Sequence, residues 1–190
     1  METTNFTMKP SRLIYALFAL SFVATILLEL LLRQVFSSLN IPADLYNSVW
    51  LSFDPQHIIG FHQKIANAGN LPGYLAAHRL DLCLALSYGL LLYSLSRIIH
   101  AWFAANPRLN RVASFFSNIA LGTAIFDLIE TSLILMMAGG QIGSGMPATL
   151  AQGAANLAKL ALFFVTIAWI VFALTYKALN SLHRNKIQSA

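Results

Sequence analysis

The stretch VASFFSNIALGTAIFDLIETSLILMMA, residues 112–138, decides the fold class of this chain. It exceeds the roughly 20 apolar residues that a helix needs to cross a bilayer. Its only charged residues are Asp127 and Glu130. A run of this length and polarity predicts a membrane-spanning helix.

Three other runs have the same character. We therefore predict an all-α integral membrane four-helix bundle, a single transmembrane domain over residues 1–190 with spans at about 13–33, 74–103, 112–138 and 150–176. The composition agrees, because 57% of the 190 residues are hydrophobic and 10% are charged, whereas soluble domains have about a quarter charged residues. A secreted domain, a nucleic-acid reader and a disordered chain are excluded.

The basic residues predict the orientation. One set falls on the side shared by both termini: Lys9, Arg12, Arg97, Arg108, Arg111, Lys177, Arg184 and Lys186. A smaller set falls on the other side: Arg33, Lys64, Arg79 and Lys159. The positive-inside rule then places both termini in the cytoplasm. The net charge of +5 thus reflects orientation, and we expect no nucleic-acid partner.

Local signals mark the span ends. Asn106 and the proline after it separate the second span from the third, because proline cannot continue a helix. Gly139 and the glycine after it end the third span. Thr149 and Gln152 have the spacing of a capping box, which predicts that the last helix begins there.

The long connection at 34–73 is expected to face outward and to contain a short helix. Asp54 and Pro55 form a helix start, an N-cap acceptor followed by proline. Ile58, Phe61 and Ile65 then recur at helical spacing, which predicts an amphipathic helix over the outer mouth of the bundle. A second apolar contact is predicted at Leu45, Val49 and Trp50.

Ionisable residues inside spans are costly and commonly functional. Asp127 and Glu130 are three residues apart, so both carboxylates face one way, and we expect them to share Lys159. Glu29 and Arg33 are four apart and are expected to pair along the first span, where a structural role is favoured.

Two polar stripes accompany these charges, one at Tyr74, Asp81 and Tyr88 and one at Gln152, Asn156 and Lys159. Such stripes face other helices rather than lipid, which predicts a polar pocket that opens outward. The candidate ligand-binding residues are Glu29, His78, Asp81, Tyr88, Asp127, Glu130, Asn156 and Lys159. Asp127 and Glu130 are also the candidate catalytic acid–base pair.

Alternatives remain open for these residues. Buried charge networks also serve purely to hold helices in register. His57 and His62 would not share a helical face, so no metal site is expected, and no cofactor is expected either. The chain lacks the common hydrolase and phosphate-binding motifs, so the sequence leaves open whether it is an enzyme.

The pattern of Asp81 on the second span, Asp127-x-x-Glu130 on the third and Lys159 on the fourth resembles a family of small bacterial four-helix membrane proteins with no assigned activity. The resemblance covers residues 52–174. Where that family carries Pro, Asn and Trp, this chain has Ala85, Thr131 and Leu160.

More distantly, the layout is similar to the emopamil-binding (EXPERA) domain, some members of which isomerise sterol double bonds. In that domain, acids on the first two helices line a sterol-sized cavity, and Glu29 and Asp81 would match them by position. The other catalytic positions of the domain have no clear counterpart here, so this resemblance implies a pocket and not the reaction.

The sequence thus favours a membrane protein whose polar pocket binds a lipid-like or isoprenoid-like molecule, and it leaves acid–base chemistry on that molecule open. The expected partners are the lipid bilayer and a small hydrophobic ligand, with a second copy of the chain as a further candidate. Two alternatives stay open. One is a small proton- or cation-coupled transporter, and the other is a structural or accessory membrane subunit.

Overall fold

The structure, a computed structural model, describes residues 10–39, 41, 49 and 52–188, with only the backbone of residues 182–188. The elements in chain order are α1 (Arg12–Ser38), α3 (Pro55–Asn67), α4 (Leu71–Trp102), α5 (Pro107–Ala138) and α6 (Met146–Gln188). All described secondary structure is helical, as the composition predicts. The helices that match the predicted spans are each longer than predicted.

The residues that separate α4, α5 and α6 are mostly those predicted. The Asn106 side chain accepts hydrogen bonds from the backbone N–H groups of Arg108 and Leu109, which caps α5. After α5, Gly140 adopts a left-handed φ of 71°, a conformation that glycine reaches without steric cost.

The predicted start of the last helix at Thr149 is wrong. α6 begins at Met146, so Thr149 already lies inside it and its backbone N–H donates to the Gly145 carbonyl. Pro147 explains the earlier start, because proline is favoured in the first turn of a helix, where its missing N–H removes no hydrogen bond.

The predicted amphipathic helix is present as α3. Its N-cap Asp54 accepts a hydrogen bond of 3.0 Å from the Gln56 N–H. The predicted apolar stripe of Ile58, Phe61 and Ile65 is buried. Of the second predicted contact, Val49 is buried against α3, while Leu45 and Trp50 lie outside the described residues.

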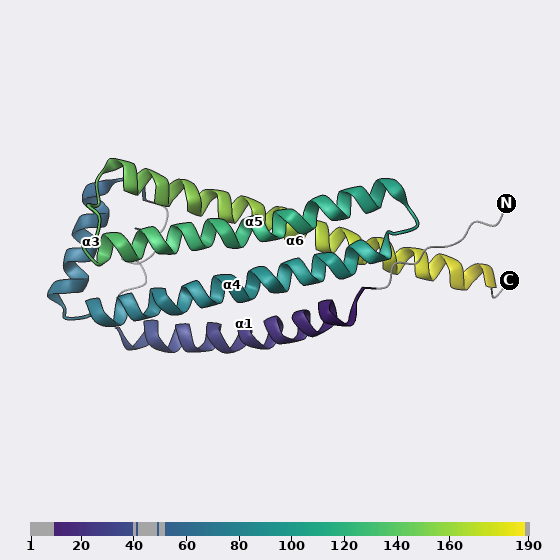
Figure 1. Cartoon of the computed structure of the whole chain (residues 1–190), viewed down its shortest axis with the longest axis horizontal. Coiled ribbons are helices and arrows are strands. Elements are labelled where there is room, and N and C mark those ends of the chain that lie inside the picture. Colours follow the sequence, from purple (N-terminus) through teal and green to yellow (C-terminus); the bar gives the residue numbers. More distant parts are fainter. Residues whose placement is uncertain (1–9, 40, 42–48, 50–51, 189–190) are drawn as a thin grey trace.

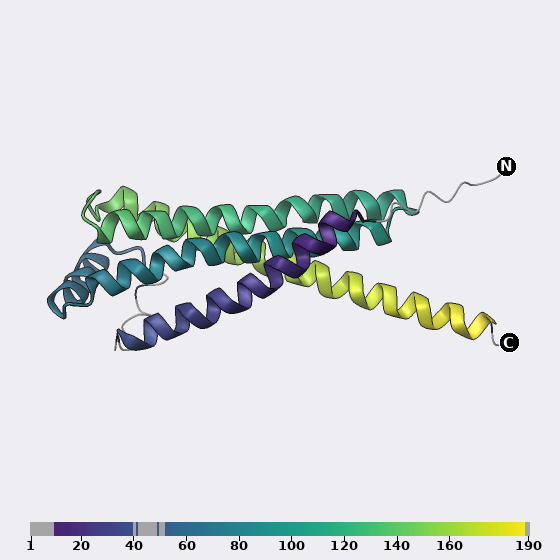
Figure 2. The same cartoon turned by 60° about the horizontal axis from the view of Figure 1, so that its bottom comes forward.

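The long helices pack in the order α1, α4, α5, α6. α4 packs against α1 and α5, and α5 packs against α6, whereas α1 has no comparable contact with α5 or α6 among the described residues. α3 contacts α4 and α6 and caps the end opposite the two termini (Figure 1). α1 and the far half of α6 diverge from the α4–α5 pair (Figure 2).

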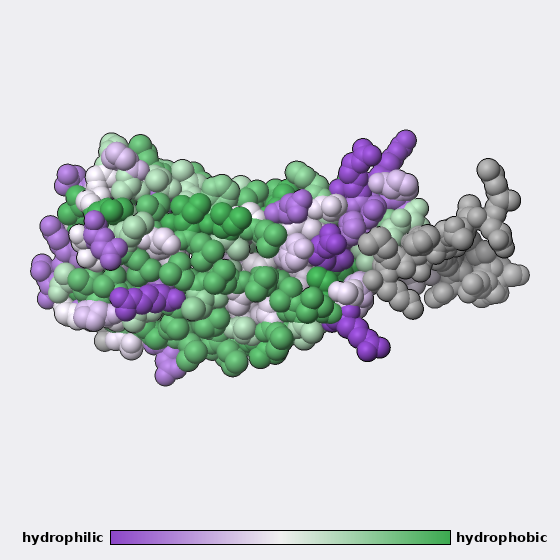
Figure 3. Space-filling view, in the orientation of Figure 1, coloured by the Kyte–Doolittle hydropathy of each residue, from purple (hydrophilic) through white to green (hydrophobic). Residues whose placement is uncertain are grey.

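Four of these helices, α1, α4, α5 and α6, are long and apolar enough to cross a membrane. Only 6% of the most apolar window of α1 is buried within the protein, so nearly all of that surface needs an apolar solvent. In space-filling view, the middle of the molecule is largely hydrophobic and the hydrophilic residues gather towards its two ends (Figure 3). These features indicate a membrane protein.

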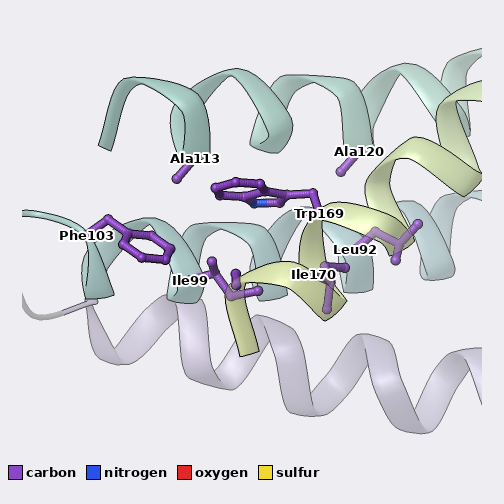
Figure 4. Close-up of a cluster of buried hydrophobic side chains, with 8 residues drawn as sticks. Leu92, Ile99, Phe103, Ala113, Ala120, Trp169 and Ile170 are labelled. Carbon is purple, nitrogen blue, oxygen red and sulfur yellow. The ribbon is translucent and has the colours of Figure 1, made fainter. Parts of the chain in front are cut away.

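The half of the molecule nearest the termini has an apolar core. Trp169 on α6 lies between α4 and α5 (Figure 4), and its ring stacks on Phe116 with centroids 4.7 Å apart. The buried members of this terminal core are Leu92, Ile99, Phe103, Ala113, Ala120, Trp169, Ile170 and Ala173. The core at this end is therefore mainly apolar, and the buried Ser94 and Ser117 hydroxyls donate to carbonyls of their own helices.

Gly89 sets how closely α4 and α5 approach. A Cβ atom at this position would lie 2.3 Å from the Ala124 Cβ, so Gly89→Ala is expected to force the helices apart and lower the free energy of unfolding by about 2 kcal/mol. Chemical unfolding in mixed micelles measures this loss of free energy. Gly60→Ala is the matched control, because nothing lies within 4 Å of a Cβ there. Equal stabilities of the two variants would contradict the close approach.

Candidate functional site

Four side chains form a largely buried polar group between α4, α5 and α6, which we name the Lys159 cluster: Tyr88, Asp127, Glu130 and Lys159. The Lys159 Nζ lies 2.8 Å from the Asp127 Oδ1 and forms an ion pair with the Glu130 Oε2. The Tyr88 hydroxyl donates a hydrogen bond of 2.7 Å to the Asp127 Oδ2. The predicted sharing of Lys159 between the two carboxylates is confirmed.

The cluster joins three helices. Asp127 and Glu130 are three residues apart on α5 and both face inward, with 5% and 2% of their surface exposed. α4 supplies Tyr88 and α6 supplies Lys159. Because each charged group has an opposite charge or a donor within reach, the cluster ties α4, α5 and α6 together at one depth.

A second polar group lies between the cluster and the α3 end. The Thr131 hydroxyl on α5 donates a hydrogen bond of 3.0 Å to the Asp81 Oδ2. The same carboxylate oxygen lies 3.8 Å from the His78 Nδ1, which is too far for a hydrogen bond. His78 is buried, and its ring packs edge-on against Tyr74 with centroids 4.5 Å apart.

Beneath α3 is a small cavity of about 30 Å³, which we name the α3 cavity. Its apolar walls are Val49, Ile58, Phe61 and Ile134, and its polar walls are His62, Tyr74, His78 and Gln152. A space of this size accommodates one or two water molecules, or a group of similar volume.

Several polar atoms of these walls are buried with no hydrogen-bond partner among the described residues. They are the His62 Nδ1, both ring nitrogens of His78 and the Gln152 Oε1. An unpaired buried polar atom costs about 1–3 kcal/mol, so such atoms normally contact water or a bound molecule. The α3 cavity is where these atoms can find a partner.

His62 is held in its neutral form. Burial, together with repulsion from His78, lowers its pKa from 6.5 to about 4. At neutral pH the imidazole therefore offers hydrogen bonds without a charge.

The predicted site residues fall into four sets, and Glu29 forms the last of them. The structure brings Tyr88, Asp127, Glu130 and Lys159 together, and it places His78 and Asp81 nearer the α3 cavity. Asn156 is fully buried on α6, three residues before Lys159.

Glu29 is not brought to either group. It receives a hydrogen bond of 2.7 Å from the Arg33 Nε on the exposed surface of α1, which confirms the predicted pair. Within the described part of the chain, α1 instead makes a polar contact with α4 through Thr25, whose hydroxyl lies 3.1 Å from the Ser87 hydroxyl.

Comparison of the chain with protein-family models, curated proteins and solved structures gives no match. We therefore infer the function from the residues and their contacts.

Sequence reasoning missed Thr131 and His62 as members of the polar region. Thr131 follows Glu130 and lies four residues after Asp127, so it belongs to the same side of α5, and this spacing could have identified it. His62 was considered only as a metal ligand. Its place in the α3 cavity depends on how α3 docks onto α4 and α6, which local spacing does not reveal.

Tyr88→Phe tests the hydrogen bond to Asp127. The change removes one donor from a buried carboxylate, and polar contacts between membrane helices are worth at most about 1–2 kcal/mol. We expect a loss of this size in the free energy of unfolding in micelles. Tyr93→Phe on the same helix is the control and should change stability little, since no described hydrogen bond to a carboxylate involves it. A Tyr88→Phe variant as stable as the control would show that this bond contributes nothing.

Proposed function

We propose that this chain is a multi-pass protein of the bacterial inner membrane with both termini in the cytoplasm. The four helices that can cross a membrane support the location in a membrane. The predicted cytoplasmic set of basic residues supports the orientation, because Arg97 near the end of α4 and Arg108 and Arg111 at the start of α5 lie at the terminal end. By this orientation α3 covers the outer end.

In that membrane the protein binds a lipid-like or isoprenoid-like small molecule, whose polar end enters the α3 cavity. One observation carries this proposal: His78 and Gln152 are 3% and 5% exposed, yet the polar atoms that they direct into this region have no partner among the described residues. Burial without a partner is unfavourable. A bound polar group would remove that cost.

Asp81 and the Lys159 cluster extend the polar region inward from the cavity. Asp81 stands 3.8 Å from His78 and accepts its hydrogen bond from Thr131, the residue that follows Glu130. In the proposal these groups form the polar floor of the site. Asp127 and Glu130 remain its candidate acid–base pair, which would act on a molecule that reaches past Asp81.

The cavity admits only the polar end of such a molecule, since its volume is about 30 Å³. Binding therefore requires α3 to move. The contacts that hold α3 are mainly apolar, with Ile58, Phe61 and Ile65 packed against Tyr74 and Ile134. A lipid-like chain can replace contacts of this kind without leaving polar groups unpaired.

A structural role is the second candidate. The observation that favours it is the mutual pairing of Tyr88, Asp127, Glu130 and Lys159, which needs no further molecule. The transporter alternative gains no such support, because no buried charged residue is described in the half of the protein nearest the termini, whose core is mainly apolar.

Native mass spectrometry of gently solubilised protein tests the proposal. We expect the wild type to carry a discrete extra mass, and the His78→Phe/Gln152→Met double variant to lose it. The matched control is His57→Phe/Gln63→Met, which makes the same two changes at exposed positions of α3 and should keep the mass. A wild type that carries nothing, or a mass retained by the cavity variant, would contradict the proposal.

A further inference from the structure

The α3 cavity also indicates which kind of polar group it accepts. This inference rests on the proposed function and adds the chemical class of the ligand. It depends on three properties of the cavity walls: their charge, their hydrogen-bonding atoms and the volume that they enclose.

The first property is the absence of charge. Among the described residues that line the cavity, none is Lys, Arg, Asp or Glu. α3 contributes His62, α4 contributes Tyr74 and His78, α5 contributes Ile134 and α6 contributes Gln152. A phosphate or carboxylate would be buried among these walls without a Lys or Arg. An ammonium group would find no carboxylate in the lining, since Asp81 lies 3.8 Å from His78 and is not itself a wall residue. Burial of an unpaired ion is strongly unfavourable.

The second property is the kind of hydrogen bond on offer. The neutral imidazole of His62 has one N–H donor and one acceptor nitrogen, and the Gln152 Oε1 is an acceptor. A bound group that pairs with the polar atoms of these walls must therefore both donate and accept hydrogen bonds. A hydroxyl group does both through a single oxygen, whereas an ether or a ketone only accepts.

The third property is size. A volume of about 30 Å³ corresponds to one or two water molecules, which matches a hydroxyl with its first carbon better than a phosphate with its four oxygens. The apolar walls, Ile58, Phe61 and Ile134 among them, suit the carbon that bears the hydroxyl.

We infer that the α3 cavity binds the uncharged hydroxyl end of an amphipathic alcohol, through His62, His78 and Gln152. The ligand of the proposed function is thus an alcohol and not a lipid phosphate, a fatty acid or an amine.

Saturation-transfer NMR on the full chain in detergent tests this inference at neutral pH. The probes are 1-hexanol, hexanoate, hexylamine and hexyl phosphate, which share one alkyl chain and differ only in the polar end. We expect hexanol to bind at least about tenfold more tightly than the three ions. Gln152→Met should weaken hexanol about tenfold, the value of one lost hydrogen bond. Gln63→Met, the same change at an exposed position of α3, should have no effect.

Three results would overturn the inference. Tighter binding of an ion that depends on Gln152 would show a charged ligand and leave the proposed function standing. Hexanol binding that is equal in Gln152→Met and wild type would show non-specific partitioning. If no probe binds, the cavity holds only water or a different group, and native mass spectrometry then decides separately whether the proposed function also fails.

Discussion

Lys159→Met is expected to lower the free energy of unfolding by about 3–5 kcal/mol, because it leaves two buried carboxylates without their cation. Asp127 and Glu130 lie within one turn of α5 and are almost fully buried. Methionine has a similar length and removes the charge with little loss of volume. Reversible unfolding in mixed micelles measures the change.

Two further variants make this prediction specific. Lys64→Met makes the same substitution at an exposed position of α3 and should cost less than about 1 kcal/mol. The triple variant Asp127→Asn/Glu130→Gln/Lys159→Met neutralises the whole cluster and should recover most of the lost stability, because no unpaired charge remains. A Lys159→Met protein as stable as Lys64→Met would contradict the ion pairs described above.

Acidification is expected to weaken the docking of α3 through His62, the second large effect. The folded-state pKa of His62 is lowered from 6.5 to about 4, so between these values the unfolded or undocked state binds more protons than the docked state. Stability is therefore full above about pH 6.5 and falls as the pH drops towards about 4. The full loss is about 3 kcal/mol for a difference of this size.

Hydrogen exchange of the α3 amides across this pH range, corrected for the intrinsic rate, measures the effect. Other groups titrate in the same range, so the quantity of interest is the difference between the wild type and His62→Gln. We expect the variant to lose most of the pH dependence, while His57→Gln on the exposed side of α3 keeps it. Identical pH profiles of wild type and His62→Gln would show that His62 does not govern docking.

The sequence predicted the parts of the fold that depend on neighbouring residues. The start of α3 followed from Asp54 and Pro55, and its buried face from the spacing of Ile58, Phe61 and Ile65. The sharing of Lys159 was predictable because two acids one turn apart in an apolar helix need a cation at similar depth, and few buried bases were available.

The sequence could not predict contacts that depend on how the helices approach. Glu29 was a candidate for the site because it matches a pocket acid of the EXPERA domain by position, yet α1 packs mainly on α4 and Glu29 pairs with Arg33 at the surface. The α3 cavity arises where α3, α4, α5 and α6 meet, so no single helix pattern contains it. The start of α6 was misplaced because the prediction rested on the capping-box spacing at Thr149 and did not consider Pro147 in the first turn.

Hydrogen exchange of α3 before and after removal of bound lipid tests most directly whether the α3 cavity holds a guest. If a molecule fills it, the α3 amides of gently solubilised wild type should exchange at least about tenfold more slowly than those of stripped protein, which corresponds to about 1.4 kcal/mol. The His78→Phe/Gln152→Met variant should show no such difference. Equal exchange in stripped and unstripped wild type would contradict the account and leave the Lys159 cluster as a device that holds helices together.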